Sequence, residues 1–103
     1  MVSQPTAGHP KGETPGLFLG EITVFYTYVL QSEKDKTTYI GSTKDLKNRI
    51  IEHNSGKTKS IKHKLPMKLI YYEAYLNKIC ARKREIELKT NSSKKEELFK
   101  RIF

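Results

Sequence analysis

An arginine and a histidine lie four residues apart in this chain, on a stretch whose apolar spacing predicts a helix. Arg49 and His53 follow the extended run Tyr39-Ile40-Gly41, which carries a phenol and ends at a glycine where we expect the chain to turn. A guanidinium binds phosphate oxygens through a planar fork, and an imidazole can carry a proton near neutral pH. These residue types suit chemistry at a phosphodiester.

Phosphodiester cleavage needs a group that activates water, a charge that offsets the phosphoryl oxygens, and stabilisation of the leaving oxygen. Arg49 can bind the non-bridging oxygens. Glu85 can hold one Mg²⁺, because that ion commonly takes one or two carboxylates and completes its shell with water and substrate oxygens. The phenol of Tyr28 or Tyr39 can act as the base or orient the water, with His53 relaying its proton.

Each of these residues also has a structural interpretation. Tyrosines in strands are usually amphipathic packing residues. The other three have helical partners that could occupy them: Asp45 or Glu52 for the arginine, the helix C-terminus for the histidine, and Lys89 for the glutamate. The residues by themselves therefore support an enzyme and a binding module equally.

Two runs of β-forming residues predict a hairpin that positions both phenols. The runs are Ile22 to Leu30 and Thr37 to Gly41, with a polar segment between them. If the loop is centred on Ser32 to Asp35, Tyr28 lies directly opposite Tyr39 on one face of the sheet. A slip by one residue would separate them.

The helix that carries the arginine and histidine has a clear start and stop. Ser42 or Thr43 can cap its N-terminus, and Gly56 is a typical residue beyond its C-terminus. Leu46 and Ile50 form an apolar stripe on it. We therefore expect a helix with one packed side and one reactive edge.

Three further elements complete the predicted domain. Met67 to Leu76 is apolar or aromatic on both faces, which predicts the central strand of the sheet. Asn77 can cap a helix over Lys78 to Lys89, and a capping box formed by Ser93 and Glu96 begins a last helix. The inward side of the middle helix holds Ala81, Glu85 and Leu88.

The charge of the chain points to a polyanionic partner. Lys and Arg number 20 against 11 Asp and Glu, which gives a net charge of +9 at pH 7. We expect nucleic acid as the partner. An acid-free segment before the third strand is a solvated loop or, as we favour, a loop that contacts phosphates; its basic residues include Lys57, Lys59, Lys62, His63 and Lys64.

Length and composition limit the architecture. With 103 residues the chain can form one domain, which we place at 22–103. Residues 1–21 hold most of the prolines and glycines and are predicted to be a flexible leader, part of which an expression vector could have contributed. One cysteine, Cys80, excludes an internal disulfide. No apolar run spans a bilayer and no signal peptide is present, so we expect a cytoplasmic protein.

Five stretches, in this order, resemble the GIY-YIG nuclease superfamily, and most closely its small stand-alone proteins similar to the nuclease domain of the excision-repair protein UvrC. They are Tyr28-Val29, Tyr39-Ile40-Gly41, the helix around Arg49 and His53, Pro66 to Glu73, and the Arg84-Glu85 to Lys89 helix. The tripeptide alone is a weak signal. The ordered set is strong and covers Phe25 to Phe103.

The resemblance implies an α+β fold, with a three-stranded antiparallel or mixed sheet flanked by helices in the order β-β-α-β-α-α. It implies a metal-dependent endonuclease that hydrolyses DNA phosphodiester bonds with one Mg²⁺ or Mn²⁺ and no small-molecule cofactor, in DNA repair or recombination. By position, the catalytic residues are Tyr28, Tyr39, Arg49, His53 and Glu85. Glu85 also binds the metal, and Gly41, which lacks a side chain, lets the substrate approach.

The chain departs from the family pattern in two places. The first motif reads Thr27-Tyr28-Val29 without its usual glycine, and the asparagine that follows the second helix in several members has Asn91 as its nearest counterpart. No base-reading motif is present, so the sequence names no particular DNA substrate, and specificity would come from protein partners. The alternatives are a catalytically inactive basic nucleic-acid-binding module and a partner of RNA or ribosomes.

Overall fold

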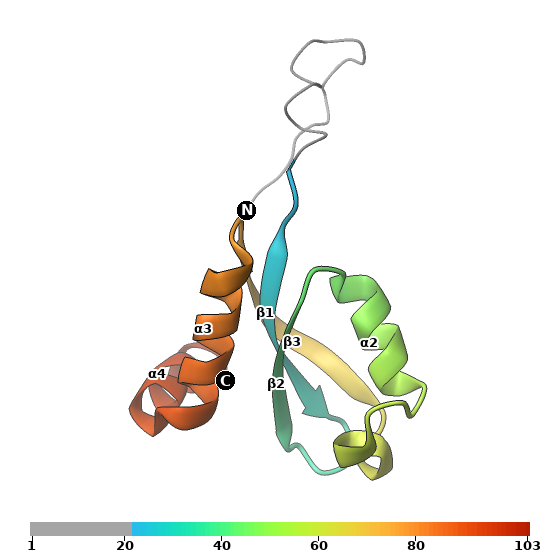
Figure 1. The fold of residues 1–103 in the computed structure, drawn as a ribbon. Coiled ribbons are helices and arrows are strands. Elements are labelled where there is room, and N and C mark those ends of the chain that lie inside the picture. The colour runs from blue at the N-terminus through green and yellow to red at the C-terminus, as the bar shows by residue number, and fades with distance from the viewer. Residues whose placement is uncertain (1–21) are drawn as a thin grey trace, which may run out of the picture.

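The computed structural model describes residues 22–103 (Figure 1). The elements of this part are β1 (Phe25–Ser32), β2 (Thr38–Thr43), α2 (Leu46–Asn54), the 3-10 helix η1 (Lys59–Lys64), β3 (Met67–Tyr75), α3 (Lys78–Thr90) and α4 (Ser92–Ile102). The α+β class and the order β-β-α-β-α-α are confirmed. The predicted leader lies outside the described residues, and within them no helix is long and apolar enough to cross a membrane.

The strands form one antiparallel sheet in the order β2-β1-β3, so β1 is the central strand. The prediction that Met67 to Leu76 is central was wrong. Thr27 to Leu30 of β1 are at most 1% exposed, whereas Tyr72 of β3 is 50% exposed. The tyrosines of β3 tolerate an edge position because a phenol is amphipathic. The number of tyrosines in β3 was therefore no evidence that both faces of this strand are buried.

The hairpin of β1 and β2 is paired two residues away from the predicted register. Tyr28 lies opposite Gly41, and Tyr39 lies opposite Leu30. β1 continues to Ser32, beyond its predicted end, and this moves the turn along the chain. A shift by two keeps each side chain on its own face. The two phenols therefore still share a face, with ring centroids 6.4 Å apart.

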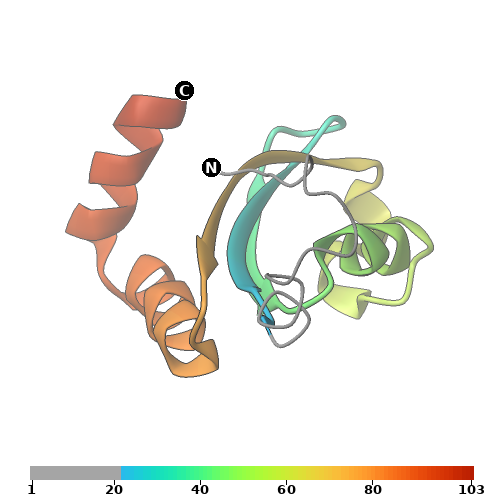
Figure 2. The ribbon, with the colours of Figure 1, turned by 90° about the horizontal axis from the view of Figure 1, so that it is seen from above.

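Helices cover both faces of the sheet (Figure 2). Seen from above, α2 and η1 lie against one face, and α3 and α4 lie against the other. The buried core on the α2 face consists of Tyr28, Leu30, Ile61 and Met67. The buried core on the α3 face consists of Val29, Ile40, Leu88 and Leu98. Alternate residues of β1 thus serve the two cores, as the period of a strand requires.

The helix starts differ in part from those predicted. Asp45 caps α2 by accepting the Asn48 N–H, whereas the predicted Ser42 and Thr43 still belong to β2. Asn77 caps α3 as predicted. The last helix begins earlier than its predicted capping box, because the Asn91 side chain caps it by accepting from the N–H of Lys94 in its first turn. Asn91 is also the residue at which α3 ends.

Candidate active site

His53 lies at the centre of a buried cluster on the α2 face. Its side chain is fully buried, with Nε2 2.8 Å from the hydroxyl of Tyr28 and Nδ1 2.6 Å from the hydroxyl of Thr58. The ring of Tyr39 packs edge-on against the imidazole, with centroids 4.8 Å apart. The structure therefore brings His53 together with Tyr28 and Tyr39, the two phenols that the sequence placed on one face of the sheet.

Burial sets the protonation of this cluster. Burial raises the pKa of Tyr28 to about 12, against the lowering effect of the nearby Arg49. Burial also lowers the pKa of His53 below its ordinary value, and the charge of Arg49 lowers it further. At neutral pH the phenol is protonated and the imidazole is neutral. His53 can then accept the Tyr28 proton at Nε2 while its Nδ1–H donates to Thr58.

The lowered pKa of His53 makes stability depend on pH. The unfolded chain binds a proton at His53 below about pH 6.5, whereas the folded chain resists protonation, so the free energy of unfolding should fall as pH drops from 7 to 5. The slope stays below the limit of about 1.4 kcal/mol per pH unit for one proton. Urea unfolding at several pH values measures it. His53→Gln should flatten the slope, the exposed His63→Gln should keep it, and an equal slope in all three proteins would contradict the assignment.

Gly41 makes room for the Tyr28 phenol. A Cβ atom added at Gly41 would clash with the Tyr28 hydroxyl and would lie 2.7 Å from its Cζ. The prediction that the chain turns at Gly41 was wrong, because Gly41 is in the middle of β2. Its lack of a side chain serves the packing of the phenol. The close approach of substrate at Gly41 stays a prediction.

Gly41→Ala should therefore destabilise the protein, by about 1–3 kcal/mol as for an overpacked core. Tyr28 cannot move aside, because it is 1% exposed and its hydroxyl is bonded to His53. Urea unfolding measures the loss. The same alanine in a Tyr28→Phe background should cost less, since the clashing oxygen is gone. Wild-type stability of Gly41→Ala would show that the phenol does not need this space.

Arg49 lies at the edge of the cluster, on the face of α2 that also carries His53. Its Nη1 donates to Glu52 Oε1 at 2.9 Å, so of the two anticipated ion-pair partners Glu52 is the observed one. The hydrogen bond to Glu52 raises the pKa of Arg49, and the two nearby phenols, Tyr28 and Tyr39, raise it further. It is about one-third exposed, and it has five N–H donors. Arg49 can therefore reach solvent and still influence Tyr28.

Glu85 lies on the inner side of α3 and is 8% exposed. Ala81 and Leu88 on the same side are also buried, which confirms the predicted inward face. Oε1 of Glu85 accepts from the Ser42 hydroxyl at 2.7 Å, and Oε2 accepts from Lys89 at 2.7 Å. Burial raises the pKa of Glu85, but these hydrogen bonds outweigh it, so the pKa lies below its ordinary value. Glu85 is ionised at neutral pH.

Two contacts hold α3 against the sheet. The guanidinium of Arg84, next to Glu85, donates to both carboxylate oxygens of Glu73 on β3, at 3.0–3.2 Å. Both side chains are less than 20% exposed. On β1, the Thr27 hydroxyl donates to the carbonyl of Ala81 at 2.7 Å. These contacts fix the position from which Glu85 reaches β2.

Strand β2 lies between the two halves of the site. In Figure 1 it runs between α3 and α2. Ser42, which holds Glu85, directly follows Gly41, over which Tyr28 packs. The negative charge of Glu85 contributes to the raised pKa of Tyr28. The Glu85 carboxylate therefore points toward β2, not into bulk solvent. It approaches β2 from the face of the sheet opposite to the one on which the phenols lie.

The donor atoms around Glu85 can be compared with what a divalent ion needs. Among the described residues, no group of three or more His, Cys, Asp and Glu side chains could form an all-protein metal site. Mg²⁺ often takes a single carboxylate together with water and phosphate oxygens. An ionised, largely buried Glu85 beside a hydroxyl fits that chemistry. Lys89 would have to share its oxygen or move.

The predicted phosphate-contacting segment is more ordered than a loop. Most of it forms η1, which the buried Ile61 anchors to the core. Thr58, just before η1, bonds to His53 and so joins this segment to the cluster. Four of its five predicted contact residues are exposed and one is half-buried: Lys57, Lys59, Lys62 and His63, then Lys64. Their contact with phosphate stays a prediction.

Two residues of the site were missed in the sequence. Ser42 was assigned to a cap but holds the Glu85 carboxylate. Thr58 lies between lysines and carries no motif, yet it binds His53. The position of Ser42 beside Gly41 was a usable signal, because neighbouring strand residues face opposite sides. Thr58 gave no comparable signal.

The fold and this arrangement define the class of the protein. A family model described as the GIY-YIG catalytic domain matches residues 24–98. The chain therefore belongs to the GIY-YIG family, a nuclease domain family, and the resemblance seen in the motifs is confirmed.

Its relatives are UPF0213 proteins. The chain is 40% identical over 74 residues to UPF0213 protein SpyM50708 of Streptococcus pyogenes serotype M5 and, equally, to UPF0213 protein MGAS10270_Spy1222 of serotype M2. Each alignment covers 71% of this chain and 79% of the relative. The solution NMR structure of UPF0213 protein BH0048 from Bacillus halodurans is 34% identical, with a TM-score of 0.48, and the match covers 75% of this chain and 83% of that one.

Proposed function

We propose that this protein is a metal-dependent endonuclease that hydrolyses DNA phosphodiester bonds, in DNA repair or recombination. One observation carries the proposal. The buried imidazole of His53 is hydrogen-bonded to the Tyr28 phenol near Arg49, and the ionised Glu85 carboxylate approaches β2, the strand over which that phenol packs. The domain belongs to a nuclease family, which supports this interpretation of the cluster.

Arg49 is the group that would bind the scissile phosphate. It is partly exposed, and the bond to Glu52 uses one of its N–H donors. The remaining donors can hold two non-bridging oxygens in one plane, which a lysine cannot do. This contact would offset the charge that grows on the phosphoryl oxygens in the transition state.

The two phenols would have different roles. Tyr28 is buried and protonated, so it would move a proton between the site and His53 rather than bind substrate. Tyr39 is half-buried and packs against His53, so its hydroxyl would orient the attacking water. The neutral imidazole can take up the proton that leaves the phenol.

Glu85 would hold the metal, one Mg²⁺ or Mn²⁺. When bound, such an ion supplies positive charge at the phosphate and a water of lowered pKa. Ser42 would keep the carboxylate turned toward β2, through the bond to Oε1. Lys89, which binds the other oxygen, would move toward the incoming phosphate.

DNA would lie along the basic side chains of η1 and of the residues just before it. These are Lys57, Lys59, Lys62, His63 and Lys64, of which Lys64 is half-buried. Thr58 connects them to His53, so a strand that crosses η1 would also reach the phenols. The net charge of +9 would favour this encounter at low salt.

One observation favours a second function, a catalytically idle nucleic-acid-binding module. Both Glu85 oxygens already accept hydrogen bonds, and Arg49 is paired with Glu52. Ion pairs of this kind can be purely structural. In that case the same charged surface would bind DNA without cutting it.

A cleavage assay separates these functions. Labelled single-stranded, duplex and branched DNA are each incubated with the protein in Mg²⁺, Mn²⁺ or EDTA. The nuclease cuts at least one substrate with metal and none in EDTA. Steep salt-dependent binding without cutting would favour the binding module. Preference for folded RNA over every DNA in a competition assay would favour a partner of RNA or ribosomes.

A further inference from the structure

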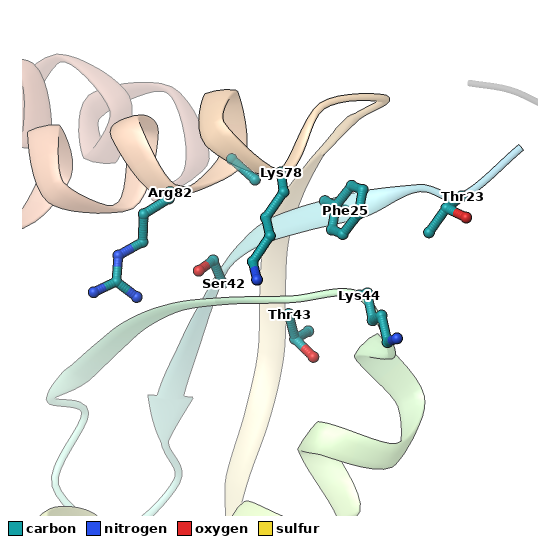
Figure 3. Close-up of a pocket in the computed structure, with 8 residues that line it drawn as sticks. Thr23, Phe25, Ser42, Thr43, Lys44, Lys78 and Arg82 are labelled. Atoms are coloured by element: carbon teal, nitrogen blue, oxygen red, sulfur yellow. The ribbon is translucent and has the colours of Figure 1, made fainter.

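A pocket of about 640 Å³ opens where the end of β2 meets the first turns of α3 (Figure 3). Its volume lies within the range of about 300–1,000 Å³ that is typical of ligand sites. Cations, hydroxyl groups and an aromatic ring line it, among them the side chains of Lys44, Lys78, Arg82, Ser42, Thr43 and Phe25. None of these six was predicted to take part in function.

The charge of this pocket is one-sided. Among the residues that the structure describes, the lining includes Lys44, Lys78 and Arg82 but no carboxylate. Lys78 and Arg82 are one helical turn apart, and in Figure 3 both extend from α3 toward Ser42. Gathering like charges costs free energy unless an anion lies between them. The pocket is therefore suited to an anion.

Arg82 is less tightly paired with a carboxylate than the cations of the candidate active site are. Arg49, Arg84 and Lys89 each contact a carboxylate at 3.0 Å or less. The carboxylate contact of Arg82 is long, 3.8 Å to Glu85, and its side chain is 68% exposed. Arg82 can therefore turn toward a ligand at little cost.

The pocket adjoins the candidate active site directly. Ser42 lines the pocket and also donates to Glu85. Arg82 lies in the pocket wall and within 3.8 Å of the same carboxylate. A polyanion whose one phosphate lies at Glu85 would thus place a neighbouring phosphate here.

Phe25 distinguishes this pocket from a simple anion site. Its half-buried ring shares the cavity with the cations. Phosphate and an apolar flat surface occur together in a nucleotide, and stacking of a base on an aromatic ring contributes about 1–3 kcal/mol. The combination fits a nucleotide better than it fits a free inorganic anion.

We propose that this pocket is a nucleotide subsite, in which Lys78 and Arg82 bind the backbone phosphate next to the cleaved one and Phe25 packs against that nucleotide's base. Lys44, on the β2–α2 connection, adds a further positive charge to the lining of the pocket. The position relative to the cut rests on the proposed nuclease function. Binding of the nucleotide itself does not.

Equilibrium binding of a fluorescent single-stranded DNA in EDTA tests the subsite without any cleavage. The double variant Lys78→Gln/Arg82→Gln should bind about tenfold more weakly at 0.1 M salt, and the slope of log affinity against log salt should become shallower by about 1. The double variant Lys83→Gln/Lys100→Gln removes the same charge from exposed positions outside the pocket, and it should stay within about twofold of wild type.

Phe25→Leu gives the second arm of the test. It keeps an apolar side chain but removes the stacking surface, so affinity should fall about tenfold while the salt slope is unchanged. If Phe25→Leu binds like wild type, the base does not pack there, and the proposal fails. It also fails if the pocket variant matches the control pair, or if wild type binds no single-stranded DNA.

The two proposals can fail separately. A protein that shows these binding losses but never cuts DNA retains the subsite and loses the nuclease function. A protein that cuts DNA equally well with and without Lys78 and Arg82, and binds it equally well, retains the nuclease function and loses the subsite.

Discussion

Glu85→Gln is expected to abolish DNA cleavage while leaving the fold intact. The amide keeps the shape of the carboxylate and can still accept the Ser42 hydrogen bond, but it cannot hold a divalent ion with a full negative charge. If the bound metal lowers the activation free energy by about 4 kcal/mol, its loss in Glu85→Gln should slow cleavage about 10³-fold. Single-turnover cleavage under saturating protein measures it.

Glu97→Gln is the matched control for this substitution. Glu97 is on α4, is 71% exposed and has one long contact to Lys94, so its loss should not change cleavage. Unfolding in urea shows whether Glu85→Gln still folds. A folded Glu85→Gln protein that cuts at the wild-type rate would remove Glu85 from the mechanism.

Arg49→Lys is expected to lower kcat by about 10²–10³-fold, with a much smaller change in DNA affinity. Lysine retains the charge but loses the planar fork that holds two phosphoryl oxygens. The partly exposed ion pair with Glu52 contributes only about 0–1 kcal/mol, so stability should change little. Cleavage rates at saturating DNA measure the effect.

Glu52→Gln separates the two roles that Arg49 could have. It breaks the same ion pair but leaves the guanidinium in place. If Arg49 acts on phosphate, Glu52→Gln should keep most of the activity. Equal losses in both variants would show that the pair, and not the arginine's phosphate contact, is what cleavage needs.

Local patterns in the sequence predicted the helical parts of the site well. The spacing of Arg49 and His53 placed them on one face, and Ala81, Glu85 and Leu88 form the buried side of α3. These predictions depend on the fixed period of one element. They did not require knowledge of how the elements assemble.

The arrangement of the strands was harder to predict. The aromatic content of β3 suggested a central strand, but an amphipathic tyrosine packs equally well at an edge. The hairpin register depended on where the turn begins, and β1 continues to Ser32, whose hydroxyl donates to the Lys64 carbonyl. That partner comes from η1, so the information lies outside the hairpin.

The partners of the site residues also come from distant segments. Ser42 meets Glu85, Thr58 meets His53, and Lys44 shares a pocket with the first turn of α3. Each contact depends on tertiary packing, and no motif in the chain marks it. This is why the sequence identified the main reactive groups but not the side chains that hold them.

The claim that Glu85 holds a divalent ion beside β2 is tested most directly by titrating Mn²⁺ into ¹⁵N-labelled protein and following the broadening of amide NMR signals. The account predicts that the first signals to broaden are those around Gly41, Ser42 and Glu85, and that Glu85→Gln removes the effect. Broadening confined to other carboxylates, or equal broadening in wild type and Glu85→Gln, would contradict it.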